Sequence, residues 1–477
     1  VVAPTVVGGG TTMSRLELAD VQGLVVSGYG RAMPVSRFLV LRVDDPARAR
    51  RWAAELADRV TSAERPEELR CINVAFTADG LRALGVAPDD LRSFPPPFRE
   101  GMVAAHRQRI LGDTGASDPA TWAWGGTERT PTATDVHALV LIYARDDDAF
   151  AAALEDEQQR LVAGGLSVVH TVEPRGLPGR DRVGKFGTEH FGFADGMSQP
   201  VVQGSGQEDA LVGDDARRNV IAAGEFVLGY PNGYGQRTPW PTLGAGAGDG
   251  AAFGRNASYL VVRQLAQDVA GFWKYLDDNS RDAEARELLA AKLVGRWRSG
   301  APLVKSAHRD DPDLGTDNSF GYAKWDRHGQ RCPLGSHIRR TNPRDSLGDD
   351  PDKALTLANL HRIVRRGRVY GPDLDNPLGG PDGRERGLVF MCLNANLERQ
   401  FEFVQHSWCN GPTFAGLYGE LDPVVATQPA DGGVLTVQAE PARRRLTTLP
   451  TFVTTRGGGY FFLPGLAALR QLGRLAS

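Results

Sequence analysis

The sequence predicts an α+β protein built from two similar units that follow one another along the chain. Three observations support this prediction: the length of 477 residues, the alternation of short apolar segments with amphipathic ones, and the return of that order in the second half. A chain this long exceeds one ordinary hydrophobic core, so two domains are expected. The hydrophobic fraction of 41% and the charged fraction of 24% are those of a globular protein.

The first half contains apolar, β-branched segments that predict strands and segments with helical spacing that predict helices. Strands are expected at 37–43, 71–76, 136–144 and 166–174, and helices at 44–60, from residue 77 onward and at 147–165. Thr77 is a candidate N-cap. A long irregular segment, which includes three prolines at 95–97, follows the second strand and its helix. The order β-α-β then β-α-β is that of a ferredoxin-like unit.

The second half repeats the strand and helix steps. A strand followed by a helix is expected at 258–276, 387–408 and 458–473, a helix ending at Gly300 at 282–300, and a strand within 360–371. We therefore expect two tandem ferredoxin-like domains, with antiparallel sheets and helices around them. The expected boundaries are a disordered tail at 1–15, an N-terminal domain at 16–218 and a C-terminal domain at 219–477.

Charge and composition argue against several classes of protein. The 55 basic and 58 acidic residues nearly cancel, to a net charge of −3, so no nucleic-acid partner is expected. No apolar run is long enough to cross a bilayer, and the first residues do not resemble a signal peptide, so no membrane partner is expected. Four cysteines in so long a chain are not a disulfide framework, which fits a reducing, cytoplasmic location. The oligomeric state stays open between a monomer and a homo-oligomer.

One histidine stands in a strongly basic stretch, "LGSHIRRTNPRD" at 334–345. His337 has no neighbouring histidine that would complete a zinc site. A single axial histidine is enough for iron when a porphyrin supplies the other four nitrogens, and nearby guanidinium groups would pair with the haem propionates. A basic surface loop with an incidental histidine is the alternative.

Two further stretches present charged groups among apolar neighbours. In "FGFADGMSQP" (191–200), Asp195 lies in a turn where Gly192 and Gly196 permit positive φ and close backbone approach. The alternative is an Asp-Gly turn that binds only its own backbone. In "HRIVRRGRVYG" (361–371), a strand would place Arg365 on the same face as Ile363, where the guanidinium points into a pocket or extends to solvent.

These three stretches together resemble the dye-decolorizing peroxidases, a family of haem peroxidases. "GFADG" matches the family's G-x-x-D-G motif, "HIRRTNPRD" its proximal histidine segment and "RIVRRG" its distal arginine segment. Further similar stretches lie at 19–30, 224–232, 258–273 and 398–405, so the resemblance covers nearly the whole chain. The chain is most similar to the longer, non-secreted bacterial members.

The resemblance implies two ferredoxin-like domains with haem b (protoporphyrin IX iron) mainly in the C-terminal one. It implies His337 as the proximal iron ligand and Asp195 and Arg365 as the distal catalytic pair. Hydrogen peroxide and a bulky organic electron donor, such as a dye or a phenol, would be the substrates. The expected cofactor contacts are His337, Arg339, Arg344, Gly192 and Gly196.

The second ring nitrogen of His337 needs an acceptor, and Glu398 or Asn396 is expected to supply it because their segment faces the proximal side in the family. Three alternatives stay open. The protein could handle haem or release its iron, as a deferrochelatase-like protein would, or it could be a non-catalytic α+β binding module. A carboxylate cluster near haem could also oxidise Mn(II), although no spacing singles one out.

Overall fold

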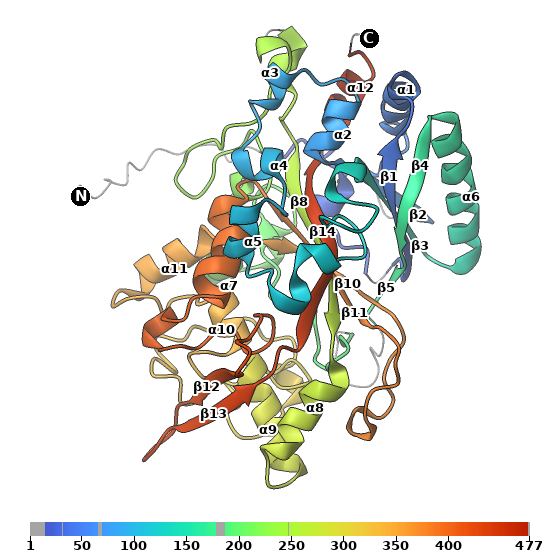
Figure 1. The fold of residues 1–477 in the computed structure, drawn as a ribbon. Coiled ribbons are helices and arrows are strands. Elements are labelled where there is room, and N and C mark those ends of the chain that lie inside the picture. The colour runs from blue at the N-terminus through green and yellow to red at the C-terminus, as the bar shows by residue number, and fades with distance from the viewer. Residues whose placement is uncertain (1–14, 31, 65–68, 178–186, 247, 476–477) are drawn as a thin grey trace.

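The computed structural model describes residues 15–30, 32–64, 69–177, 187–246 and 248–475. The tail expected at 1–15 therefore lies outside the described residues, except for Arg15. Figure 1 shows a central sheet with helices on its sides and a largely irregular region below and to the left, in the view drawn there. The fold is α+β with a large antiparallel sheet, as the sequence predicts.

Within the described ranges, ten strands form the central sheet. Their order is β10-β5-β1-β3-β2-β14-β8-β11-β9, with β4 also paired to β1. The strands of the sheet are β1 (Val35–Val43), β2 (Arg70–Phe76), β3 (Ala138–Ala144), β4 (Leu166–Val172), β5 (Pro174–Arg175), β8 (Ser258–Gln267), β9 (Val364–Arg365), β10 (Arg368–Tyr370), β11 (Gly387–Asn394) and β14 (Val453–Leu463). Two small pairs lie apart from it: β6 (Val201–Val202) with β7 (Val220–Ile221), and β12 (Gly433–Val437) with β13 (Arg444–Leu449).

The two halves of the chain share this sheet. Strand β14 pairs with β2 at Phe462 and Phe76, and β10 pairs with β5 at Val369 and Arg175. Because β10 also pairs with β11, the hydrogen-bonded path closes on itself. The large hydrophobic clusters on the sheet contain residues from both halves, so the two ferredoxin-like units are joined by backbone pairing and by a common core.

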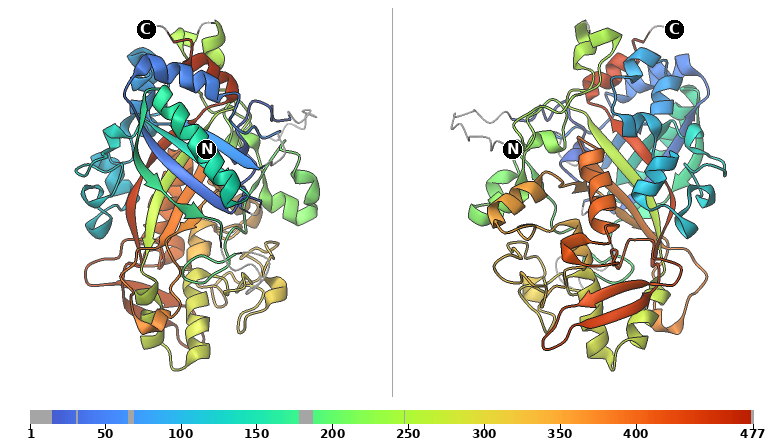
Figure 2. Two further views of the ribbon diagram at one scale, coloured as in Figure 1. Left: turned by 90° about the vertical axis from the view of Figure 1, so that its right-hand side faces the viewer. Right: turned by 60° about the vertical axis from the view of Figure 1, so that its left-hand side comes forward.

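Helices cover the sheet and build the C-terminal irregular region. Figure 2 shows α6 lying across the strands of the first half, in contact with β3 and β4. Asp45 caps α1 by accepting a hydrogen bond from the Arg48 amide, and Thr77 caps α2 as predicted, accepting from the Gly80 amide. The α-helices are α1 (Pro46–Leu56), α2 (Ala78–Ala83), α3 (Pro88–Leu91), α4 (Pro96–Glu100), α5 (Ala105–Leu111), α6 (Asp147–Ala163), α7 (Gly213–Asn219), α8 (Val269–Asp278), α9 (Ala283–Val294), α10 (His337–Thr341), α11 (Pro351–Asn359) and α12 (Leu466–Leu472).

Several boundaries differ from the sequence prediction. The helix expected at 44–60 covers only Pro46–Leu56, and the one expected to end at Gly300 ends at Val294. Gly295 ends it because its φ of 101° is a left-handed conformation that favours glycine. The segment expected to be irregular holds the short helices α3, α4 and α5, and prolines occupy the first turn of α4. The helical part of 387–408 consists of two π-helical turns, Glu398–Glu402 and Val404–Cys409.

None of the helices within the described ranges is long and apolar enough to cross a membrane. The four cysteines, Cys71, Cys332, Cys392 and Cys409, are free and buried.

Candidate functional site

A cavity of about 300 Å³ lies between the sheet and the C-terminal irregular region, and it brings the three predicted segments together. His337, Asp195 and Arg365 all line it. The strand face of β8, β11 and β14 forms one wall, with Leu265, Phe390 and Val453 among its side chains. The remaining lining contains both polar and apolar residues, and its apolar side chains include Phe191, Phe193, Val294, Ile338, Ile363, Leu388, Phe401, Val404, Val424 and Val425.

His337 begins the short helix α10 and is held by a buried carboxylate. Its Nδ1 lies 2.9 Å from Oδ2 of Asp422, whose side chain has no exposed surface. The other oxygen of Asp422 accepts hydrogen bonds from the amides of Val424 and Val425. This contact occupies Nδ1, so Nε2 is the imidazole nitrogen that is left for a ligand in the cavity.

Electrostatics reinforce this pairing. Burial by itself lowers the pKa of the His337 imidazole, but the charge and hydrogen bond of Asp422 outweigh it, so the pKa is raised. Burial likewise raises the pKa of Asp422, yet His337 and the amides favour the carboxylate enough to lower it. A carboxylate hydrogen-bonded to the far nitrogen of a histidine fixes the ring orientation and increases the basicity of the ligating nitrogen.

Asp422 corrects the sequence-based expectation for the acceptor. Glu398 instead lies 3.7 Å from Arg107, with more than half of its side chain exposed, and Asn396 caps the following turn through the Arg399 amide. The family segment suggested the wrong residues because Asp422 follows 85 positions after His337 in an Asp-Pro turn. In the sequence, such a turn predicts only a local chain reversal.

A buried arginine on α10 helps to hold His337 and Asp422 together. Arg340, on the same helix, is fully buried, and its guanidinium donates to the carbonyls of Trp408, Gly411 and Glu420. These carbonyls belong to the segment that leads to Asp422. Arg340 therefore fixes the helix that carries the imidazole against the chain that carries its carboxylate partner.

Asp195 and Arg365 form an ion pair in the lining of the cavity. Arg365 Nη1 lies 3.1 Å from Asp195 Oδ1, and Nη2 donates to the Met197 carbonyl at 2.8 Å. The Gly196 amide also donates to Oδ1 of Asp195, at 2.6 Å. Among the described residues, both side-chain contacts of the carboxylate fall on Oδ1, so Oδ2 is the oxygen that faces a ligand in the cavity.

The strand register selects Arg365 rather than its neighbour, as the alternation predicts. Arg365 and Ile363 both line the cavity, whereas Val364 is buried in the core on the other side of the sheet. Arg366 donates to the carbonyls of Leu24 and Val25 and does not line the cavity.

Three arginines with neutral partners line the cavity near Ser198. Arg344, which the sequence analysis proposed, donates to the carbonyl of Phe320 and to both the carbonyl and the side chain of Asn318. Arg296 donates to Ser198 Oγ at 3.2 Å, and Arg362 donates to the Ser198 carbonyl at 3.1 Å. Within the described parts of the chain, none of these three guanidinium groups forms a salt bridge.

Burial disfavours the charged form of these three arginines. It lowers the pKa of Arg296 and of Arg362 to about 9, with the nearby charge of Arg344 acting in the same direction. Burial also lowers the pKa of Arg344. Buried charges are normally paired, so this corner of the cavity has the chemistry of an anion site. Arg296 and Arg362 could not be singled out in the sequence, because individual arginines carry no signal in a chain that is rich in arginine.

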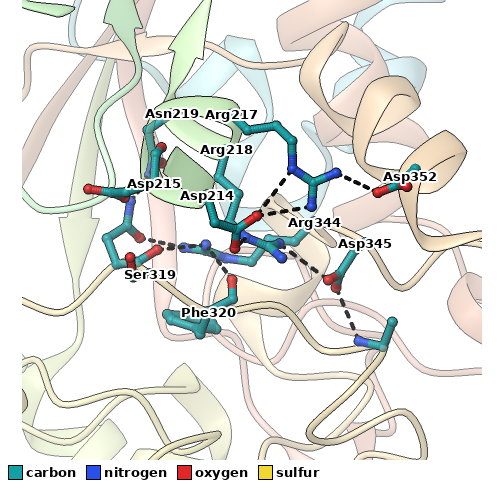
Figure 3. A network of polar contacts seen from close by, with 12 residues as sticks. Asp214, Asp215, Arg217, Arg218, Asn219, Ser319, Phe320, Arg344, Asp345 and Asp352 are labelled. Carbon is teal, nitrogen blue, oxygen red and sulfur yellow. Dashed lines mark hydrogen bonds and ion pairs between the residues drawn. The ribbon is translucent and has the colours of Figure 1, made fainter. Parts of the chain in front are cut away.

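A polar network behind Arg344 fixes this corner, as Figure 3 shows. Arg218, at the end of α7, lies 3.2 Å from Asp345, whose other oxygen accepts from the Tyr322 amide. The carbonyl of Arg218 accepts from Arg362, and Asn219 accepts from the side chain of Asn318. Helix α7 therefore positions the Arg218 carbonyl, which binds Arg362, and the Asn219 side chain, which binds Asn318.

The remaining predicted contacts do not reach the cavity. Arg339 is buried but donates to Asp326 and to the carbonyl of Cys332, and it is absent from the cavity lining. Gly192 and Gly196 have φ values of 94° and 93° and shape the turn before and after Asp195. Neither glycine lines the cavity. In the described residues no group of three or more His, Cys, Asp or Glu side chains could hold a metal ion, so no Mn(II) cluster is evident there.

The sequence is similar to known dye-decolorizing peroxidases, although no protein-family model matches it. It is 30% identical over 498 residues to dye-decolorizing peroxidase msp1 of Mycetinis scorodonius, covering 97% of this chain and 88% of that protein. It is 33% identical over 428 residues to the multifunctional dye peroxidase DyP2 of an Amycolatopsis species, covering 84% of this chain and 82% of that protein.

The fold is also similar to those of solved dye-decolorizing peroxidases. A dye-decolorizing peroxidase of Auricularia auricula-judae, in complex with imidazole, matches with a TM-score of 0.80 at 26% identity, over 96% of this chain and all of that one. A dye-decolorizing peroxidase in complex with 2,6-dimethoxyphenol matches with a TM-score of 0.78 at 28% identity and the same coverage. The DyP-type peroxidase of an Anabaena species matches with a TM-score of 0.77 at 26% identity, over 95% of this chain and 94% of that one.

Proposed function

Because the chain belongs to the dye-decolorizing peroxidase family, we propose that its cavity binds haem b through His337 and that Asp195 and Arg365 act on the peroxide there. Proteins of this family are haem peroxidases, so the chain is an oxidoreductase with peroxide as the electron acceptor. One observation supports the proposal most strongly: the imidazole, the carboxylate and the guanidinium, from three distant parts of the sequence, line one cavity.

The residues of the cavity fit haem. The body of the macrocycle is apolar and flat, and aliphatic and aromatic side chains from both the sheet and the C-terminal region line the cavity. The two propionates are carboxylates, and the buried Arg296, Arg344 and Arg362 have no carboxylate partner among the described residues. His337 would bind the iron through Nε2, since Nδ1 is taken by Asp422.

When bound, haem supplies the iron that reduces peroxide by two electrons and then recovers them singly from a donor. Oδ2 of Asp195 takes a proton from one peroxide oxygen and returns it to the other, which becomes the leaving group. Arg365 keeps its proton and stabilises the negative charge that develops as the O–O bond breaks. Asp422 keeps the His337 imidazole oriented and basic.

The organic donors we propose are dyes and phenols, the classes named for the relatives. Aromatic donors larger than the cavity would give up single electrons at its opening or at the protein surface. An aromatic surface residue would then carry the electron inward, and the chain offers eight Trp and ten Tyr for this purpose.

The test is the peroxide reaction of the haem-loaded protein, followed by absorption in stopped flow. The Asp195→Asn variant keeps the carboxylate's shape but cannot move the proton. We expect it to bind haem normally and to react with peroxide roughly 100-fold more slowly or worse, the usual contribution of a general acid–base. A wild-type protein whose haem spectrum does not respond to peroxide would contradict the proposal and favour a haem-handling role.

A further inference from the structure

The turn that carries Asp195 is a small hairpin with an acid folded inside it. Thr188 and Ala194 form an antiparallel bridge, and the Glu189 amide donates to the Phe193 carbonyl at 3.0 Å. Gly192 closes the turn with a φ of 94°, and its amide donates to the Glu189 carbonyl at 2.8 Å. A side chain at position 192 would also collide with Arg298, whose Nη2 lies 2.8 Å from the site of a Cβ atom.

The Glu189 carboxylate fills the inside of this hairpin. Oε2 accepts from the Phe191 amide at 2.9 Å, and Oε1 accepts from the Phe193 amide at 3.0 Å. Oε2 also accepts from Nε2 of Gln267, at 2.6 Å, and Gln267 is the last residue of strand β8. One carboxylate therefore satisfies two hairpin amides and ties the hairpin to the sheet.

The outer side of the hairpin is held separately. Trp273 Nε1 donates to the Phe191 carbonyl at 3.1 Å, and Arg298 Nε donates to the Gly192 carbonyl at 3.2 Å. The Ala194 amide donates to the Arg298 carbonyl at 3.0 Å. The hairpin is thus fixed to the C-terminal region on one side and, through Glu189, to the sheet wall of the cavity on the other.

A buried carboxylate is energetically costly in the hairpin. Burial, together with the charge of Asp195, raises the pKa of Glu189 to about 6, against the lowering effect of its three hydrogen bonds. An amide cannot replace it, because each of its two oxygens faces at least one N–H donor. The carboxylate is therefore matched to the hairpin in a way that glutamine is not.

We infer that Glu189 is a positioning residue for Asp195, which holds the hairpin so that the Asp195 carboxylate meets Arg365 over the cavity. The inference rests on the proposed role of Asp195 in the peroxide reaction. Asp195 follows directly on the braced segment, and its Oδ1 lies 3.1 Å from Nη1 of Arg365. A shift of the hairpin by a fraction of an ångström would change the position of the proton acceptor relative to bound peroxide.

The experiment measures the peroxide reaction of haem-loaded Glu189→Gln. We expect unchanged haem content, an unchanged KM for the organic donor and a rate constant for peroxide that falls roughly tenfold or more, since small misplacements of a reacting group are costly. The double variant E189Q/Q267E lets the new amide donate to a carboxylate on β8, and it should recover part of the lost rate. A purely structural role would lower stability and haem content without this selective loss and rescue.

Two controls make the outcome decisive. Asp373→Asn alters an exposed acid that touches His190 of the same hairpin, and it should leave the rate unchanged. If Glu189→Gln does not fold, Gln267→Ala removes the hydrogen bond from β8 to Glu189 and keeps both hairpin amides bound to the carboxylate, and it should slow the peroxide step in the same direction. A normal rate in Glu189→Gln, with a slow Asp195→Asn, would overturn this inference alone. A normal rate in Asp195→Asn would overturn the proposed function as well.

Discussion

Nδ1 of His337 lies 2.9 Å from Oδ2 of Asp422, a carboxylate with no exposed surface that is also bound by two backbone amides. The imidazole is therefore oriented before any ligand arrives, with Nε2 directed to the cavity.

Asp422→Asn should keep the haem but change its electronic properties. The amide is a weaker acceptor than the carboxylate, so the imidazole becomes less basic and the ferric state less stabilised. We expect a higher Fe(III)/Fe(II) potential by spectroelectrochemistry and a loss of haem affinity or activity of about 10- to 100-fold. Glu398→Gln is the matched control, because that acid lies away from His337, and an equal change in it would contradict the assignment.

Substitutions of Arg365 and Arg366 should have different effects, one on the peroxide reaction and the other on stability. Arg365→Leu removes the guanidinium from the cavity, and we expect the peroxide step to slow by about 100- to 1,000-fold, as for the loss of one donor to a developing negative charge. Arg366→Leu leaves the Leu24 and Val25 carbonyls without their donor and should lower the unfolding free energy instead. Stopped-flow absorption and denaturant unfolding measure the two effects, and the reverse assignment would refute the strand register used here.

Arg344 and Arg339 should also differ, although both are buried near His337. Arg344→Ala should weaken haem binding by roughly 10- to 100-fold, because a charge-assisted hydrogen bond to a propionate is lost. Arg339→Ala should instead destabilise the fold by about 3–5 kcal/mol, because it leaves the buried Asp326 carboxylate without its cation. Haem transfer to an acceptor apoprotein measures the first quantity. Equal haem loss rates in Arg344→Ala and the wild type would exclude Arg344 as a propionate partner.

Glu189 should make stability depend on pH between about 4.5 and 6. Its pKa is raised in the folded protein, to about 6, so the unfolded chain loses the proton at lower pH than the folded one. Folding stability from this group is therefore complete below the unfolded pKa and falls as the pH rises through 6, by roughly 2 kcal/mol. The difference in unfolding free energy between the wild type and Glu189→Gln should shrink by most of that amount from pH 4.5 to 6.5. A difference that stays constant with pH would mean that Glu189 titrates normally.

The sequence allowed the strands and the three central residues to be predicted for distinct reasons. Strands such as 37–43 and 136–144 are apolar on both faces and lie in the common core, so composition alone identifies them. His337, Asp195 and Arg365 were identified because each lies in a short motif that the family shares. The motifs also predicted their proximity, which the cavity bears out.

The parts that were missed depend on contacts between distant residues. Asp422 lies 85 positions from His337, and Arg296 and Arg362 meet at Ser198 only after the chain has folded. Arg339 was placed at the cofactor because basic neighbours of a histidine are natural propionate partners. Its place on α10 turns it towards Asp326 instead, which no local pattern could reveal. Helix ends such as Val294 were missed because Gly295 and Gly300 are both credible stops.

The most direct test is a haem titration of the wild type and His337→Ala, followed by absorption in the Soret region with and without added imidazole. The wild type should bind one haem tightly with the spectrum of a histidine-ligated iron. His337→Ala should bind haem weakly or with an altered spectrum, and free imidazole should restore the wild-type bands by filling the space that the side chain leaves. A variant that binds haem with wild-type affinity and an unchanged spectrum in the absence of imidazole would contradict the account.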